Sequence, residues 1–116
     1  MSQLNTSKAA NRRASIRKPA RRTIRLQCRR GVLGLGPNLG SAYVNVSETG
    51  VQVVTNVPLT AGGEVEIVFD GFGMRNSLKR AGQVVWVSSV EGGACRAGIH
   101  FVKPLAFREV QSISAP

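Results

Sequence analysis

The segment Ala42–Val54, AYVNVSETGVQVV, decides the fold that the sequence predicts. Apolar residues alternate on both sides of a polar centre, Asn45–Gly50, and such alternation is typical of half-buried strands. A short polar side chain, a hydroxyl two positions later and a glycine at the sixth position favour a turn between two strands. We therefore predict one strand over residues 41–46 and a second over residues 50–55.

The rest of the chain repeats this pattern. Alternation with a period of two predicts four further strands, at residues 23–29, 64–70, 78–90 and 95–102. Many short strands with Gly-rich turns and no helix between them predict an all-β sandwich or barrel. After Pro104, four apolar residues can share one face of a short helix that covers one end of the barrel: Leu105, Phe107, Val110 and Ile113.

The net charge of +10 is concentrated near the N-terminus. Residues 1–30 carry ten cations and no acid, whereas residues 31–116 carry six of each. We expect a disordered tail at 1–11, a flexible basic ligand-binding arm at 12–22, a β-barrel domain at 23–104, and a short C-terminal helix and tail at 105–116. A basic arm on a neutral globule indicates an anionic partner.

The composition argues against an enzyme. The chain has a single histidine, His100, which alternation places on the outer side of a strand, and its acids are scattered singly. Cys28 and Cys95 lie in apolar runs, which favours buried free thiols over a disulfide, and they do not make a zinc site. We expect no cofactor and no metal. Without a signal peptide or a membrane-spanning run, we expect a cytoplasmic protein with no membrane insertion.

The polar residues are better suited to binding. Two arginines four positions apart, such as Arg13 and Arg17, can converge on one anionic ligand, pair with guanine O6 and N7, or stack on a purine. Asn45 and Ser47, two positions apart on an extended segment, point the same way and could read the edge of a base. Gly50 permits a tight turn or a close approach of a ligand. These residues suit an anionic, guanine-bearing ligand.

Four motifs in order resemble the PilZ family of bacterial cyclic di-GMP receptors. They are Arg13-x-x-x-Arg17, Asn45-x-Ser47-x-x-Gly50, the segment GQVVWV at 82–87 and the segment GIHF at 98–101. The resemblance covers about residues 12–105. It implies a six-stranded antiparallel barrel with a terminal helix that binds the second messenger cyclic di-GMP.

The same resemblance implies roles for the site residues. Arg13 and Arg17 would grip phosphates and guanine, Asn45 and Ser47 would hydrogen-bond a guanine, and Gly50 would give a close backbone approach. Arg12 could contact a second, intercalated ligand molecule. We expect the ligand to order the arm over the barrel, so that a downstream partner protein, unidentified from the sequence, reads the new surface.

Several alternatives stay open at this stage. The spacing of the first motif recurs at Arg17/Arg21, Arg21/Arg25 and Arg25/Arg29, although Arg13/Arg17 leaves the short linker before the first strand that the family has. The domain could also be a nucleotide-independent protein-interaction module. Nucleic-acid binding through the basic arm is disfavoured, because the few aromatic residues fall mostly in core register.

Overall fold

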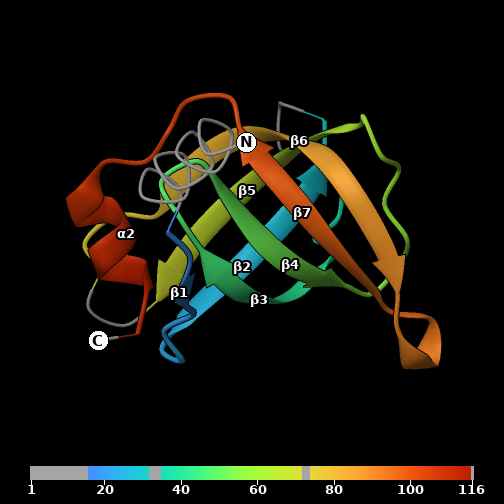
Figure 1. Ribbon diagram of the computed structural model, residues 1–116, viewed down its shortest axis with the longest axis horizontal. Coiled ribbons are helices and arrows are strands. Elements are labelled where there is room, and N and C mark those ends of the chain that lie inside the picture. Colours follow the sequence, from blue (N-terminus) through green and yellow to red (C-terminus); the bar gives the residue numbers. More distant parts are fainter. Residues whose placement is uncertain (1–15, 32–34, 72–73, 116) are drawn as a thin grey trace, which may run out of the picture.

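The computed structural model of the chain describes residues 16–31, 35–71 and 74–115, and within them an antiparallel sheet of seven strands curls into an open barrel (Figure 1). In chain order these strands are β1 (Lys18–Pro19), β2 (Ile24–Arg30), β3 (Gly40–Val46), β4 (Gly50–Thr55), β5 (Glu64–Gly71), β6 (Leu78–Ser89) and β7 (Cys95–Phe101). A single 3₁₀ turn, η1 (Glu91–Gly93), joins β6 to β7 in the described chain, and the helix α2 (Phe107–Ile113) follows β7. The predicted all-β fold with a terminal helix is confirmed, with β1 as an additional short strand.

The strand order in the sheet is β1-β3-β4-β7-β6-β5-β2, and every pairing is antiparallel. β1 and β2 are therefore the two edges. The curl of the sheet brings β2 back beside β3, so the strands lie next to each other without a backbone ladder between them (Figure 1). This seam is where the barrel stays open.

The core fills the inside of the curled sheet. Alternate residues of each strand point inward, as the sequence predicts: Leu26 and Cys28 in β2, Val51 and Val53 in β4, and Ile99 and Phe101 in β7 are buried. Phe69 makes edge-to-face contacts with Tyr43 and Phe101, at centroid distances of 5.1 and 6.5 Å. Cys28 and Cys95 are buried free thiols, as expected.

Helix α2 covers one end of the barrel, as predicted, but with a different face. Val110 and Ile113 are buried, and Leu105 is buried just before the helix begins. Phe107 is 59% exposed, so its assignment to the core face was wrong. The helix starts at Phe107, whose ring lies on the outer surface. The Nζ atom of Lys18 lies 5.2 Å from the centre of the Phe107 ring.

The chain just before β2 is fixed to the barrel. β1 pairs with β3, with Lys18 opposite Val46 and Pro19 opposite Asn45, and the amide of Ala115 donates to the carbonyl of Pro19. Arg21 donates from its side chain to the carbonyls of Gln111 and Ser114 at the end of α2. The predicted tail at 1–11 and the first part of the arm, including Arg12 and Arg13, lie outside the described residues.

Candidate ligand-binding site

Arg17 and Asn45, one residue from each predicted motif, are in direct contact. The Nη1 atom of Arg17 donates a 2.9 Å hydrogen bond to Oδ1 of Asn45, across 28 positions of sequence. The contact follows from the pairing of Pro19 with Asn45, which lays the residues just before β1 beside the end of β3. The structure thus brings Arg17 of the first motif into contact with Asn45 of the second motif.

The amide of Asn45 is held in one orientation. A guanidinium can only donate, so the Asn45 atom that faces Arg17 is the oxygen. Its Nδ2 then donates to Oε1 of Gln52 at 3.1 Å, and Gln52 is the residue directly opposite Asn45 in β4. Gln52 is a polar residue within an apolar run, and this was the sequence signal that could have indicated its role.

Trp86 continues the same row of side chains. Gly98 in β7 lies opposite both Gln52 and Trp86. A Cβ atom on Gly98 would collide with Nε1 of Trp86, so the indole lies across the backbone at this glycine. Ala97 and Ile99 point into the core, and the Gly98 position and the indole therefore face outward. The indole is 38% exposed, so Trp86 is not one of the aromatic residues in core register.

Ser47 and Gly50 shape the turn between β3 and β4. The Ser47 side chain is 1% exposed, and its oxygen accepts hydrogen bonds from the amides of Thr49 and Gly50 at 3.3 and 3.2 Å. Gly50 is buried against β7, where a Cβ atom would collide with the carbonyl oxygen of Ile99. Ser47 lies beyond the end of β3, so the structure does not place its hydroxyl beside the Asn45 amide on the outer surface.

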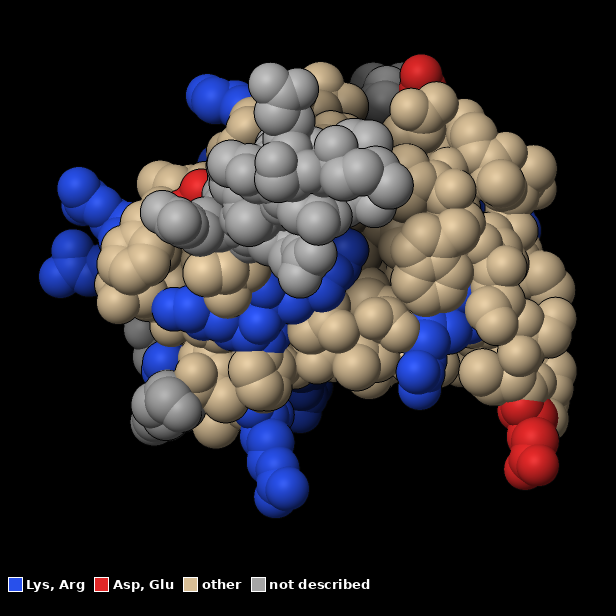
Figure 2. Space-filling model, viewed as in Figure 1, with Lys and Arg blue, Asp and Glu red and all other residues tan. Residues whose placement is uncertain are grey.

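The outer surface carries unneutralised positive charge. Arg17 is exposed, and the one salt bridge within the described part of the chain joins Arg80 to Glu109 at 3.0 Å. Figure 2 shows Lys and Arg side chains spread over the face in view, whereas acidic side chains surface only at scattered points. The described residues contain no group of three His, Cys, Asp or Glu that could hold a metal ion.

This arrangement suits a ligand that combines negative charge with a flat ring. Arg17 supplies the cation, the Asn45 and Gln52 amides supply hydrogen bonds, and Trp86 supplies an aromatic face. The row crosses β3, β4, β7 and β6, three strand spacings of about 4.8 Å each. That length is sufficient for a nucleotide lying across the strands.

The PilZ domain family model matches residues 11–115, nearly the whole chain. The chain belongs to the PilZ domain family. PilZ domains are cyclic di-GMP-binding modules and generally act as ligand receptors rather than enzymes. The family assignment confirms the resemblance that the four motifs indicate. No curated protein matches the sequence of this PilZ domain. None of its described helices has the length and apolarity that crossing a membrane requires.

Proposed function

We propose that this PilZ domain is a receptor that binds cyclic di-GMP on the outer face formed by Arg17, Asn45, Gln52 and Trp86. The observation that carries the proposal is the hydrogen bond between Arg17 and Asn45, because it joins one residue of each motif on an exposed, positively charged surface. Cyclic di-GMP carries two phosphates and two guanine bases, and these groups complement the cation, the amides and the aromatic ring of this surface.

Arg17 is the anchor for the ligand. Its guanidinium contacts a neutral amide and no described carboxylate, so a phosphate could bind it without first displacing an ion pair. Charge-assisted bonds of this kind are about twice as strong as neutral ones. By resemblance to the family, Arg13 acts with Arg17, and Arg12 contacts a second ligand molecule. Both lie in the segment upstream of the described chain.

Trp86 and the two amides hold a base. The indole lies against Gly98 and is 38% exposed, so the exposed part of the ring is available for stacking. Stacking of a base on an aromatic side chain contributes about 1–3 kcal/mol. The Asn45 amide lies three strand spacings away from Trp86, where it can hydrogen-bond a guanine edge. Gln52 lies between them and holds the orientation of that amide.

Ser47 and Gly50 act indirectly in this proposal. Their conformation fixes where β3 ends and β4 begins, and so fixes the register that sets Asn45 opposite Gln52. In this proposal Ser47 and Gly50 maintain the backbone conformation of the site, and Asn45 and Arg17 contact the ligand directly.

The output of the receptor is a surface for a partner protein. Ligand bridging between Arg17 and the upstream arginines would fix the arm over the barrel, at a cost of about 2–5 kcal/mol of the interaction energy. A cytoplasmic partner would then read the arm together with the ligand. Amide hydrogen exchange in residues 12–17 should slow on ligand addition, and unchanged exchange there would contradict this step.

Calorimetric titration with cyclic di-GMP tests the function itself. We expect micromolar or tighter binding, loss of binding in Arg17→Ala, and no heat with GTP. A ratio of two ligands per chain would support the role of Arg12, whereas a ratio of one would exclude it. Absence of binding would overturn the receptor assignment and leave the protein-interaction module as the alternative.

A further inference from the structure

Strand β7 places one exposed side chain on each side of the Trp86 indole. The indole lies across Gly98, where a Cβ atom would collide with its Nε1 atom. Residues two positions apart in a strand point to the same face, so Arg96 and His100 lie on the outer face on either side of Gly98. Each lies about 7 Å from Gly98 along the strand, at about 3.4 Å per residue. Trp86 therefore has an arginine on one side and a histidine on the other.

The charge of Arg96 is not neutralised within the described part of the chain. Arg96 is exposed, and the residues opposite it, Val54 in β4 and Ser88 in β6, are uncharged. No hydrogen bond or ion pair joins its guanidinium to a described residue. An anion can therefore bind Arg96 without first displacing a carboxylate.

His100 is also exposed, and its ring has no hydrogen-bond partner among the described residues. It lies opposite Gly50 in β4 and Gln83 in β6. Gly50 carries no side chain, and Gln83 donates from Nε2 to the carbonyl of Gly62, just before β5 and away from β7. The two residues opposite the ring therefore leave it free to contact a ligand.

The charged groups around His100 do not hold its ring. The residues opposite it in β4 and β6 are uncharged. The turn before β4 carries Glu48, the segment after β7 carries Lys103, and Glu64 lies in β5, one strand beyond β6. Among the residues that the structure describes, none makes an ion pair with His100. A positive charge on the ring is thus available to an anionic ligand.

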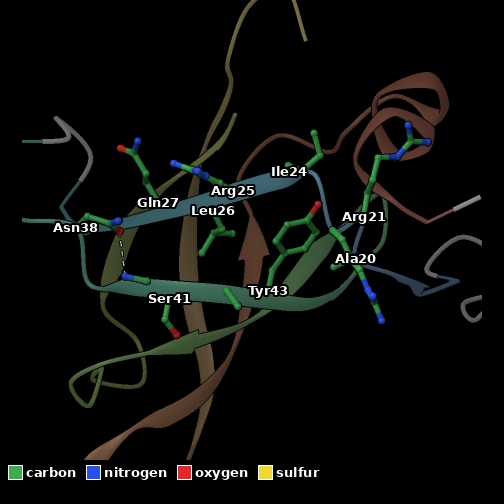
Figure 3. Close-up of a pocket in the computed structure, with 12 residues that line it drawn as sticks. Ala20, Arg21, Ile24, Arg25, Leu26, Gln27, Asn38, Ser41 and Tyr43 are labelled. Carbon is green, nitrogen blue, oxygen red and sulfur yellow. Dashed lines mark hydrogen bonds between the residues drawn. The ribbon is translucent and has the colours of Figure 1, made fainter. Parts of the chain in front are cut away.

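The exposed arginines of the barrel seam lie on the other side of β3. Arg22 and Arg25 line a hollow of about 650 Å³ beside the first part of β3, Gly40–Tyr43 (Figure 3). β2 borders β3 at this seam, whereas β4, β7 and β6 follow β3 on its opposite side. Arg22 and Arg25 therefore do not lie beside a base on Trp86, but the two side chains on β7 do.

The chemistry of cyclic di-GMP matches this arrangement. Each ribose of the ligand is bonded to both phosphates, so a guanine that stacks on Trp86 has anionic groups close to it. Arg17 contacts Asn45 at the β3 end of the nucleotide face, two strands away from β7. The phosphates on the Trp86 side therefore need other cations, and β7 supplies them.

We propose that Arg96 and His100 bind the phosphates next to the guanine that stacks on Trp86, and that protonation of His100 strengthens this binding. The proposal rests on the proposed cyclic di-GMP receptor function. An imidazole gains a positive charge as pH falls from about 8 to about 5, whereas arginine stays charged throughout. The phosphodiesters of the ligand stay anionic over the same range. The affinity for cyclic di-GMP should therefore rise as pH falls.

The first test follows the ring of His100 itself. His100 is the only histidine in the chain, so its imidazole signals in an NMR spectrum need no further assignment. The full chain is titrated with acid, with and without saturating cyclic di-GMP. We expect the midpoint of the ring titration to move to higher pH when the ligand is bound, because a phosphate favours the charged imidazole. An unchanged midpoint would overturn the role of His100.

Calorimetry at about pH 5.5 and about pH 8 tests the effect on affinity. The wild type should bind cyclic di-GMP at least roughly fivefold more tightly at the lower pH. His100→Gln should bind weakly at both values, and His100→Lys, which stays charged at both, should bind tightly at both. A pH dependence that persists in His100→Gln would contradict the proposal.

Arginine variants separate this proposal from the receptor function. Arg96→Gln should weaken binding at least roughly threefold at both pH values, since it removes a charge-assisted contact. Arg75→Gln, an exposed arginine outside the nucleotide face, is the matched control and should change nothing. Binding that Arg17→Ala abolishes, but that pH and the β7 variants leave unchanged, would overturn this proposal and leave the receptor assignment standing. No binding by the wild type at either pH would overturn both.

Discussion

The carbonyl oxygen of Ile99 in β7 occupies the space that a side chain at position 50 would need, and this contact explains the glycine of the second motif. Gly50 lies opposite His100 in the β4–β7 pairing, and the two backbones approach closely there. The glycine is therefore required by the barrel itself, whether or not a ligand is bound.

Replacing Gly50 with alanine should destabilise the fold. Overpacking of a tight site costs about 1–3 kcal/mol, and here the obstacle is backbone, which cannot rotate away. Chemical denaturation of Gly50→Ala should show this loss in the free energy of unfolding. Gly36→Ala is the matched control, because the nearest atom to its Cβ would be 4.0 Å away. Equal stability of the two variants would contradict the account.

Asn45 and Gln52 should be energetically coupled. Their side-chain amides share a 3.1 Å hydrogen bond, and Arg17 fixes the orientation of the first amide. In a double-mutant cycle of Asn45→Ala and Gln52→Ala, we expect a coupling of about 0.5–1.5 kcal/mol in the free energy of cyclic di-GMP binding. Strictly additive losses would indicate that the two side chains act separately and that Gln52 does not position Asn45.

Tyr43→Phe should weaken the attachment of helix α2. The Tyr43 hydroxyl donates a 2.5 Å hydrogen bond to the carbonyl of Ile113, the last residue of the helix. Phenylalanine keeps the ring contact with Phe69 but removes this hydrogen bond, and the carbonyl keeps only the amide of Arg21 as a donor, at 3.2 Å. We expect a loss of about 0.5–1.5 kcal/mol, the net contribution of one hydrogen bond. Hydrogen exchange of the α2 amides should accelerate more than that of β4. Uniform acceleration would instead indicate global destabilisation.

Alkaline pH should destabilise the barrel. Burial raises the pKa of the Cys28 thiol from 9.0 to about 11, and that of the Tyr43 hydroxyl from 10.0 to about 12, against smaller opposing effects of Arg30 and Arg21. A raised folded-state pKa of a neutral acid stabilises the fold below the unfolded-state value, and this stabilisation is lost as pH rises through the folded-state value.

The free energy of unfolding should therefore fall between pH 9 and pH 12. In Cys28→Ala the decline should begin near pH 10, where unfolded Tyr43 starts to ionise. Urea denaturation at a series of pH values measures both onsets. If the variant and the wild type decline together from pH 9, then Cys28 does not contribute.

The strands were predictable because their signal is local. Alternation with a period of two located all six long strands to within one or two residues, and the turn chemistry of Ser47 and Gly50 located the hairpin. The resemblance of the motifs then assigned residues to the site. The hydrogen bond between Arg17 and Asn45 agrees with that assignment, whereas the buried hydroxyl of Ser47 was not expected.

The parts that sequence reasoning missed depend on strand register. Trp86 reaches Gly98 because the β6–β7 ladder shifts by one residue between Val84 and Trp86, which turns the indole outward. A count of alternation through Val85 cannot show such a shift. The role of Gln52 likewise follows only from its partner across the hairpin, and the open seam follows from how far the whole sheet curls.

Trp86 is the only tryptophan in the chain, so its fluorescence reports directly on the proposed nucleotide face. The most direct measurement is a fluorescence titration of the wild type and of Arg17→Ala with cyclic di-GMP. We predict saturable quenching in the wild type, because a base stacks on the exposed part of the indole, and at least roughly tenfold weaker binding in the variant. Binding detected by calorimetry without any change at Trp86, or quenching that Arg17→Ala leaves intact, would contradict the account.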